Sequence, residues 1–461
     1  MTAIDTIYQA YLSSHAVTTD SRAVTQGSLF FALRGDHFDG NAFVPTALEQ
    51  GAALCVTSDE RYREQEHCVV VDDVLETLQA LAREYRRSLQ IPVIGITGTN
   101  GKTTTKELVN AVLSRRYRTV ATRGNYNNHL GVPLTLLSIG AEAQVAIVEM
   151  GANHPGEIAF LCEIADPDSG LITNVGRAHL EGFGSFEGVV HTKTELYRHL
   201  AGKHGLVFVN ADNGRLMHEA ERLATIPGLR SVIPAYQPDN PAFVPSTIEK
   251  TPLSLITYGG SQEADVRGTL VDDKSTPYMH FYFEVGDNVY NVRTHLLGAY
   301  NFDNCMAAVA VGLHYGVEPW DIKEAVEAYH PANQRSEYKE TKRGNHLYLD
   351  CYNANPSSMA AAIDAFRTMG GTVAIVGGMH ELGREEREEH GKVIDQLRNC
   401  GLRRVMLVGP EWNHLALEEN MMCFADTESL RRHLLETDLC GETILVKGSN
   451  TNRLWTLEEL L

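Results

Sequence analysis

The sequence predicts an α/β protein of three domains, with a central doubly wound, P-loop ATPase-like sheet. Three observations predict this fold. The length of 461 residues suggests roughly three domains. A glycine-rich loop at residues 95–104 lies between an apolar run and a helical pattern. After that loop, apolar strands alternate with helical segments, which is typical of a parallel sheet covered by helices.

The glycine-rich loop reads GITGTNGKTT and follows the apolar residues 91–94. Gly98 and Gly101 allow the backbone to turn tightly toward an anion, and the start of the next helix directs N–H groups at phosphates. Lys102 supplies a charge for the outer phosphates, and the Thr103 hydroxyl can reach Mg²⁺. The alternative is a glycine-rich turn that precedes a lysine by chance, but the surrounding strand and helix favour nucleotide binding.

Apolar and helical patterns divide the chain into domains at residues 1–88, 89–316 and 317–461. The first ends in a predicted helix over 74–88. In the second we expect an antiparallel flap over 251–298, because four strand-like runs follow one another there. The first domain also has short apolar runs at 29–33, 53–57 and 68–71. The other expected elements are strands 93–97, 145–150, 171–175, 206–210, 346–351, 372–377, 404–409 and 443–447 and helices 103–114 and 304–315.

The composition argues against several classes of function. The formal net charge is −19 and no run of Lys or Arg stands out, which argues against nucleic acid as a partner. The eight cysteines form no C-x-x-C pair, so we expect no zinc site, and their scatter suggests a reducing cytosol. With no signal-peptide pattern and no apolar run of about 18 residues, we expect a cytoplasmic protein without membrane insertion.

Three polar side chains beyond the loop are candidates for the same site. Glu149 ends an apolar strand, where an acidic residue beside a phosphate loop is expected to bind Mg²⁺. His179 follows the next strand and faces the same crevice, and Lys193 lies downstream. Taken alone, these residues would be a solvated carboxylate, a satisfied polar histidine and a surface lysine.

Six motifs, in the same order, resemble the Mur ligase family: GTNGKTT, GNYNNHLGVPLTLL, EMGANHPGEI, AHLEGFGSFEGV, NFDN and DCYNANPSSM. The N-terminal stretch DSRAVTQGSLFFALRGDHFDG also matches, so the resemblance covers nearly the whole chain. GANHPGEI, HLEGFGS and YNANPSSM are most similar to the members that add a dipeptide. The phosphate loop has the family's shorter form, because Ile96 stands where the general pattern has its first glycine.

The resemblance implies an ATP-dependent ligase that joins D-alanyl-D-alanine to UDP-N-acetylmuramoyl-tripeptide through an acyl phosphate, in peptidoglycan synthesis. It implies an N-terminal UDP-sugar-binding domain, a central ATP-binding domain, and a C-terminal Rossmann-like domain that closes on ATP and receives the dipeptide. The cofactors would be ATP and two Mg²⁺ ions, with CO₂ bound as a carbamate on Lys193. The partners would be these small molecules, and we expect a monomer.

The resemblance also assigns residues to the site. The catalytic residues would be Lys102, Glu149, His179 and Lys193, and the metal ligands Thr103, Glu149, His179 and Lys193. The residues expected on ATP are Gly98, Thr99, Asn100, Gly101, Lys102, Thr103, Thr104, Asn301, Asn304, Arg335 and Asp350. Those expected on the acceptor or the dipeptide are Ser21, Arg22, Phe38, Asp39, Gly40, Asn127, Asn128, His129, Asn353, Asn355, Lys447 and Arg453. Without the resemblance, many of these would be turn residues.

Three positions depart from the family's pattern. Tyr300 stands where the family often has a histidine near the adenine. Gly378 replaces the aspartate of G-D-M-x-E-L-G, and Asn450 replaces the arginine of K-G-S-R. We expect Arg453, three residues further on, to supply the missing cation for the dipeptide carboxylate.

Three alternatives stay open. The first is a Mur ligase that adds a single amino acid, which the strings HLEGFGS and YNANPSSM disfavour. The second is a ligase similar to folylpolyglutamate synthase, which would leave the N-terminal domain without a role. The third is a non-catalytic nucleotide-binding or scaffold protein, against which the intact Lys102, Glu149, His179 and Lys193 argue. The third residue of the tripeptide, diaminopimelate or lysine, also stays open.

Overall fold

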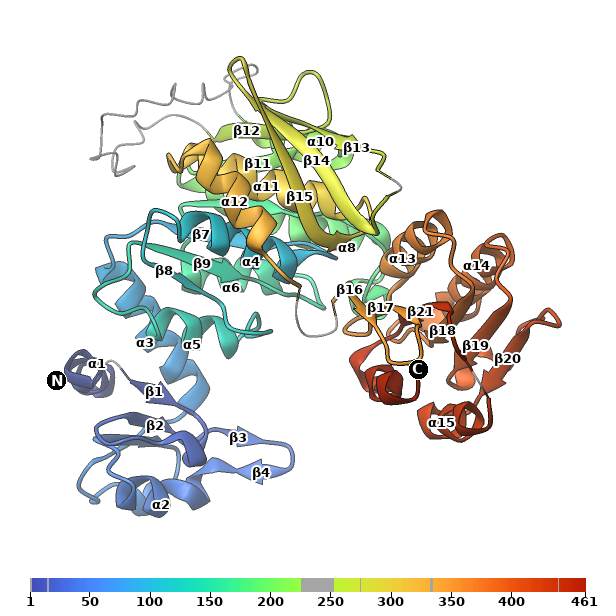
Figure 1. The fold of residues 1–461 in the computed structure, drawn as a ribbon. Helices are drawn as coiled ribbons and strands as arrows, with labels where there is room; N and C mark the ends of the chain where they lie inside the picture. The colour runs from blue at the N-terminus through green and yellow to red at the C-terminus, as the bar shows by residue number, and fades with distance from the viewer. Residues whose placement is uncertain (1, 15, 225–252, 274, 332–334, 438) are drawn as a thin grey trace.

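The computed structural model describes the chain except for residues 1, 15, 225–252, 274, 332–334 and 438. Within the described part, the strands form a four-stranded, a nine-stranded and a six-stranded sheet and a two-stranded hairpin. The three larger sheets follow one another along the chain and lie in three separate bodies (Figure 1). The predicted α/β fold, with a large central unit between two smaller ones, is confirmed.

The N-terminal sheet is parallel and has the strand order β1-β2-β5-β6. Helix α3 has the predicted bounds, because Asp73 caps its first turn by accepting a hydrogen bond from the Glu76 N–H at 2.8 Å. The elements are α1 (Ala3–Ser14), β1 (Val17–Thr18), β2 (Leu29–Phe31), β3 (Arg34–Gly35), β4 (Phe38–Asp39), α2 (Val44–Glu49), β5 (Leu54–Thr57), β6 (Cys68–Val70) and α3 (Val74–Ser88). The hairpin β3–β4 projects away from this sheet (Figure 1).

The central sheet has the order β15-β14-β13-β12-β11-β10-β7-β9-β8. Its strands are β7 (Val93–Thr97), β8 (Thr119–Ala121), β9 (Val145–Glu149), β10 (Ser169–Ile172), β11 (Leu206–Asn210), β12 (Ser254–Gly259), β13 (Val266–Val271), β14 (Tyr278–Val285) and β15 (Asn288–Leu297). Its helices are α4 (Lys102–Leu113), α5 (Gly131–Leu137), α6 (Glu157–Ala165), α7 (Leu180–Phe183), α8 (Phe186–Lys193), α9 (Glu195–Gly202), α10 (Gly214–Leu223), α11 (Asn301–His314) and α12 (Pro319–Ala328).

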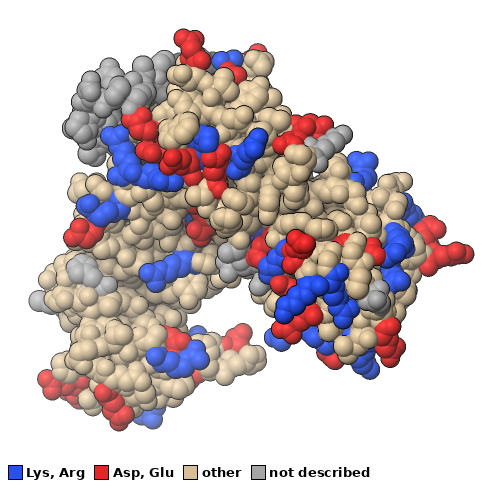
Figure 2. All heavy atoms as spheres, viewed as in Figure 1, with Lys and Arg blue, Asp and Glu red and all other residues tan. Residues whose placement is uncertain are grey.

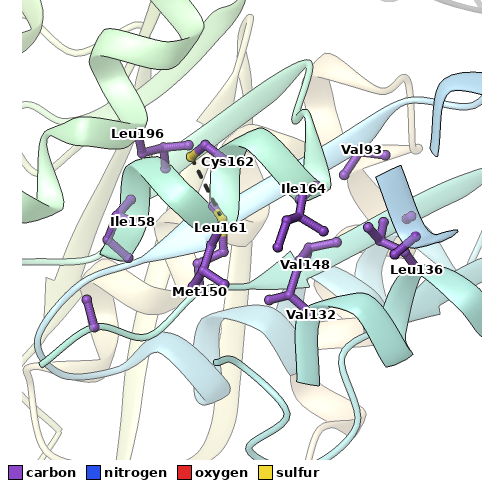
Figure 3. Packing of buried hydrophobic residues seen from close by; sticks show 14 of the residues in the cluster. Val93, Val132, Leu136, Val148, Met150, Ile158, Leu161, Cys162, Ile164 and Leu196 are labelled. Carbon is purple, nitrogen blue, oxygen red and sulfur yellow. Dashed lines mark hydrogen bonds between the residues drawn. The ribbon is translucent and has the colours of Figure 1, made fainter. Parts of the chain in front are cut away.

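Helices cover both faces of the central sheet, so β7 and β9 are buried along their whole length. On one face, Val148 and Met150 at β9 pack against Leu161 and Ile164 of α6 (Figure 3). On the other face, Ile147 packs in a separate cluster with residues of α4 and α11. This double packing fixes where the carboxyl ends of the strands lie.

Two predictions for the central domain are wrong in detail. The antiparallel flap predicted over 251–298 is only partly antiparallel: β12 pairs in parallel with β11, and β13 in parallel with β12, so the antiparallel pairs are β13–β14 and β14–β15. Residues 251, 252 and 274 of that prediction lie outside the described residues. The strand predicted over 171–175 ends at Ile172. There the chain leaves the sheet because the Thr173 hydroxyl donates to the Asn100 carbonyl at 2.6 Å and Asn174 holds the same loop.

The C-terminal sheet has the order β16-β17-β21-β18-β19-β20 and is parallel except for β16. Strands β16 and β20 were not predicted. The elements are β16 (Glu337–Glu340), β17 (His346–Asp350), α13 (Pro356–Thr368), β18 (Val373–Gly377), α14 (Glu386–Arg398), β19 (Arg404–Val408), β20 (Met421–Phe424), α15 (Thr427–Glu436) and β21 (Thr443–Lys447). The boundaries at 88 and 317 stay predictions. Because α12 packs on α4 and β15, we propose that the C-terminal domain begins after Ala328.

Figure 2 shows Lys and Arg interleaved with Asp and Glu over the viewed face. Among the residues that the structure describes, no helix is both long and apolar enough to cross a membrane.

Candidate active site

A cavity of about 640 Å³ lies where the phosphate loop and the end of β9 face the ends of β17 and β21. It is therefore lined by both the central and the C-terminal domain. The predicted site residues that line it are Thr99, Asn100, Gly101, Lys102, Thr103, Thr104, Asn127, Asn128, His129, Glu149, His179, Asn301, Asn304, Arg335, Asp350, Asn353 and Lys447.

The two glycines of the phosphate loop have backbone shapes that other residues rarely adopt. Gly98 has φ 145°, and a Cβ added there would lie 2.0 Å from the Thr173 hydroxyl oxygen. Gly101 has φ 77°, and a Cβ added there would lie 2.5 Å from Oδ1 of Asn304. Both positions therefore need glycine, and the loop is held close to the start of α11.

Lys102 is the first residue of α4, one residue before the predicted helix start. Its Nζ donates to the carbonyl oxygens of Gly98 at 2.9 Å and Thr99 at 3.0 Å, within the loop. Burial lowers the pKa of Lys102, while the charge of Glu149 opposes that shift. The ammonium thus lies in the loop where the outer phosphates of a nucleotide would sit.

Glu149 is 1% exposed, at the end of β9. Its Oε1 accepts hydrogen bonds from the Thr103 hydroxyl at 3.2 Å and from Nδ2 of Asn127 at 2.8 Å. Its Oε2 is buried and has no hydrogen-bond partner among the described residues. A buried carboxylate oxygen of this kind is costly unless a cation satisfies it. Thr103 and Glu149 therefore fit a hard divalent cation such as Mg²⁺.

His179 and Lys193 complete the predicted ligand set less directly. His179 has φ 51° at the start of α7, and its Nδ1 is hydrogen-bonded to Glu381 of the C-terminal domain. Lys193 is 2% exposed, and its Nζ donates to the Ala152 carbonyl at 3.2 Å. Ala152 lines the cavity, so Lys193 lies directly behind its wall. Burial lowers the pKa of Lys193 well below its usual value, and the charge of Lys102 adds to this shift.

Within the described chain, no three His, Cys, Asp or Glu side chains converge as a metal site. A magnesium site here would therefore need oxygen donors that are not His, Cys, Asp or Glu side chains. These would be the Thr103 hydroxyl, phosphate oxygens of the nucleotide and a modified Lys193. The side chains present fit that mixed set, because Glu149 already has one unpartnered oxygen.

The predicted adenine-side asparagines form a short network at the start of α11. Nδ2 of Asn304 donates to Oδ1 of Asn301 at 2.8 Å, and Asn301 in turn donates to the Leu297 carbonyl at 2.8 Å. Tyr300, the first departure from the family's pattern, lines the cavity, and its hydroxyl lies 2.8 Å from Oγ of Ser336. The phenol thus links the central domain to the segment that enters the C-terminal domain.

The C-terminal side of the cavity contains one buried ion pair. Nζ of Lys447 lies 3.2 Å from Oδ2 of Asp350, and the lysine side chain is fully buried. The guanidinium of Arg335 lies 3.5 Å from the centroid of the Tyr352 ring. In this arrangement Lys447 supports Asp350 from inside the sheet.

Asn355 lies beside the cavity and joins the two domains. It caps α13, and its Nδ2 donates to Oδ1 of Asn100 in the phosphate loop at 2.8 Å. Next to it, Oγ of Ser357 accepts a hydrogen bond from the Arg177 N–H at 2.9 Å. The amino end of α13 thus contacts both the phosphate loop and the segment after β10.

The remaining predicted substrate residues do not line this cavity. In the N-terminal domain, Nη2 of Arg22 lies 2.7 Å from Oδ2 of Asp20. Asp39 accepts a hydrogen bond from the Asn41 N–H at 3.0 Å. Such short-range contacts are typical of turns. Arg453 is exposed and has φ 53°. The predicted residues outside the cavity are Ser21, Arg22, Phe38, Asp39, Gly40, Gly98, Lys193, Asn355 and Arg453. Their roles toward substrate stay predictions.

The structure gives a physical account of the glycine at position 378. A Cβ added to Gly378 would lie 2.3 Å from Oε2 of Glu411, which comes from the loop after β19. That oxygen is buried with no partner among the described residues, and Oε1 lies 3.5 Å from Nδ1 of His380. The carboxylate of Glu411 therefore fills the space beside Gly378 where the family's pattern has an aspartate.

Sequence reasoning missed several residues at the domain interface. Asn174 and Arg177 follow β10 as Glu149 follows β9, so their position at a strand end could have indicated them. Glu381 lies in the stretch GGMHELG, but its contact with His179 joins positions far apart in the sequence. No local pattern indicates that contact.

The fold and the cavity define a nucleotide-binding α/β protein of the P-loop type, in which a Rossmann-like domain faces the loop. Family models match along the chain: the Mur ligase family, catalytic domain, at residues 13–93; the Mur ligase middle domain at 96–226; and the Mur ligase, glutamate ligase domain, at 334–450. A relative from Bacillus subtilis, named UDP-N-acetylmuramoyl-tripeptide--D-alanyl-D-alanine ligase, is 32% identical over 453 residues, which are 95% of this chain and 91% of the relative. The chain belongs to the Mur ligase family.

Solved structures agree with this assignment. MurF from Acinetobacter baumannii superposes with a TM-score of 0.81 at 27% identity, over 98% of this chain and 97% of that chain. MurF from Thermotoga maritima, solved in complex with ADP, gives a TM-score of 0.80 at 26% identity, over 97% of both chains.

Proposed function

We propose that the protein is an ATP-dependent ligase that joins D-alanyl-D-alanine to the terminal carboxylate of UDP-N-acetylmuramoyl-tripeptide. The product is the pentapeptide precursor of peptidoglycan. The observation that carries this proposal is the single cavity in which Lys102 and Glu149 face Asp350 and Arg335 across two domains. The named relatives and the ADP complex of a similar protein support it. We also propose that it acts as a monomer in the cytoplasm.

The proposed reaction has two steps. The acceptor carboxylate attacks the γ-phosphate of ATP and releases ADP, which forms an acyl phosphate. The dipeptide amine then attacks the acyl carbon, loses a proton, and expels phosphate from a tetrahedral intermediate. The protein contributes mainly position and charge. Lys102 neutralises the outer phosphates, while Asn174 fixes the loop by accepting the Asn100 N–H at 3.0 Å.

We propose that Thr103 and Glu149 hold one Mg²⁺, and that Glu149, His179 and Lys193 hold a second. Bound Mg²⁺ would reduce the repulsion between the γ-phosphate and the incoming carboxylate. We propose that Lys193 is carbamylated. Its low pKa favours the neutral amine, which is the form that reacts with CO₂, and a carbamate is an oxygen donor suited to Mg²⁺.

The test is a ligation assay with a defined UDP-N-acetylmuramoyl-tripeptide, ATP and Mg²⁺. We expect phosphate release and product only when both the acceptor and D-alanyl-D-alanine are present. Parallel reactions with L-alanine, D-glutamate, L-lysine or diaminopimelate test the single-amino-acid ligases, and a folate acceptor with glutamate tests the folylpolyglutamate alternative. Nucleotide binding without phosphate release in any mixture would favour a non-catalytic scaffold.

A further inference from the structure

We propose that Glu381 of the C-terminal domain is a positioning residue that sets the tautomer and orientation of His179. The metal site of the central domain would then be completed only when the C-terminal domain is docked. This inference rests on the proposed function, because it takes His179 as a ligand of the catalytic metal.

Glu381 of the C-terminal domain contacts the His179 segment of the central domain through both its side chain and its backbone. The His179 Nδ1 is hydrogen-bonded to Oε2 of Glu381. In addition, the Glu181 N–H donates to the backbone carbonyl of Glu381 at 3.3 Å. The backbone of Glu381 is therefore held beside α7 independently of its side chain.

Both residues have left-handed backbones, with φ 51° at His179 and φ 60° at Glu381. This conformation is unfavourable for a residue other than glycine, and it persists where the surrounding structure holds it in place. A His179 backbone held in this way turns the ring toward the neighbouring domain. The ring also meets the Phe183 ring edge-on, with centroids 6.4 Å apart, and Phe183 packs beneath the Nζ of Lys193.

The chemistry of a neutral imidazole explains why the carboxylate matters. One ring nitrogen carries the proton and the other has a free lone pair. A carboxylate accepts a hydrogen bond, so Glu381 places the proton of His179 on Nδ1. Nε2 is then left with the lone pair that a metal needs, as in other proteins where a carboxylate fixes a ligating histidine. Without Glu381 the ring would exchange between both tautomers.

A second set of contacts fastens the same two segments without touching His179. Nη1 of Arg177 lies 2.8 Å from Oε2 of Glu385 and 3.2 Å from Oε1 of Glu389. Because Glu385 is partly exposed and Arg177 keeps its ion pair with Glu389, Glu385→Gln removes one contact between the domains while leaving them docked and the imidazole contact in place. That variant is the matched control for Glu381→Ala.

The first measurement is the nitrogen NMR spectrum of the full chain labelled at histidine, with the His179 signals identified by their loss in His179→Gln. We expect an Nδ1-protonated ring in the wild type and in Glu385→Gln, and a mixture of tautomers in Glu381→Ala. An unchanged His179 ring in Glu381→Ala would overturn the proposal. Thermal unfolding checks that each variant is folded.

The second measurement is Mn²⁺ binding, by electron paramagnetic resonance, in the presence of a non-hydrolysable ATP analogue. We expect Glu381→Ala to weaken Mn²⁺ binding about 10-fold to 100-fold, the usual effect of removing such a partner, and Glu385→Gln to leave it nearly unchanged. Equal losses in both variants would mean that Glu381 acts only through docking, and would overturn the positioning role. A wild type that fails to ligate D-alanyl-D-alanine would instead refute the proposed function, whatever the tautomer result.

Discussion

The phosphate loop and the carboxyl edge of the C-terminal sheet face each other across one cavity, yet they are built in opposite ways. The loop concentrates its chemistry in residues 95–104, directly after β7. The opposite edge places the ends of β17 and β21 on the cavity, with the loops after β18 and β19 beside them, and these segments are far apart in the sequence and meet only in the folded sheet. A compact motif tolerates few substitutions. On the dispersed edge, a side chain that is absent at one position can be replaced by a side chain from a neighbouring loop.

The position beside Gly378 illustrates this difference. Glu411 approaches it from another loop and fills the space of a side chain at 378. No such replacement is available in the phosphate loop, where Gly98 and Gly101 meet Thr173 and Asn304 directly. We therefore expect substitutions in the loop to have larger effects than substitutions on the C-terminal edge, and the predictions below test that order.

The largest effect is expected for Lys102→Ala. Removing the ammonium leaves the repulsion of the outer phosphates uncompensated, so ligation should fall by about 10³-fold or more, as for other phosphate-binding cations. The fold should persist, because no buried anion depends on Lys102 alone: Glu149 is also bonded to Thr103 and Asn127. Steady-state ligation and thermal unfolding measure the two quantities. Near-normal turnover in a folded variant would refute the role of the loop.

Variants of Lys193 test whether catalysis needs an anionic side chain at this position, behind the cavity wall. Lys193→Ala should lose nearly all activity, by about 10²-fold or more, and small carboxylic acids in the buffer should partly restore the rate by occupying the vacated space. Lys193→Arg should be inactive and not rescued, because guanidinium keeps the positive charge. Substantial activity in Lys193→Arg would show that the side chain serves as a cation, and the carbamate would have to be abandoned.

The same contrast explains what sequence reasoning could reach. The loop, the strand over 93–97 and the helix over 74–88 depend on neighbours in the chain, so their patterns predicted them. The contacts Glu381–His179 and Glu411–Gly378 depend on how β18 and β19 lie against other elements, which no local pattern encodes. The strand over 171–175 was predicted too long because apolar periodicity cannot show that Asn174 leaves the sheet to hold the loop.

A partly buried acid in the first turn of α11 should make stability depend on pH. Burial, with the charge of Asp212 adding, raises the pKa of Asp303 to about 6. The native state then binds its proton more tightly than the unfolded chain, so stability should fall as pH rises from about 4 to about 6 and stay level above. Asp303→Asn should gain about 2 kcal/mol at pH 8 and nothing near pH 4. Urea unfolding at both pH values checks this, and an equal gain at both would contradict it.

Variants of Asn355 test whether the C-terminal domain helps the phosphate loop to bind ATP. Asn355→Ala removes a helix cap and should cost about 1 kcal/mol of stability. It should also raise the KM for ATP several-fold, because Asn100 loses its partner. Asn355→Ser is the control. A serine side chain can still cap the helix, but it has no amide group to pair with the side chain of Asn100. If Asn355→Ala raises the KM for ATP and Asn355→Ser does not, the cap and not the amide pair supports the loop.

The most restricted effect is expected for Arg453, on the edge where substitution is easiest, because only one of the three substrates should be affected. Its side chain is exposed and does not line the cavity, so Arg453→Ala should leave the stability and the KM for ATP unchanged. If Arg453 replaces the cation absent at Asn450, the KM for D-alanyl-D-alanine should rise about 10-fold, the effect of losing roughly 1.4 kcal/mol from one charge-assisted contact. The double variant Asn450→Arg/Arg453→Ala should then recover part of that loss, because the cation returns to the family's position. An unchanged dipeptide KM in Arg453→Ala would remove this residue from the site, and the dispersed edge would have to hold the carboxylate by other means.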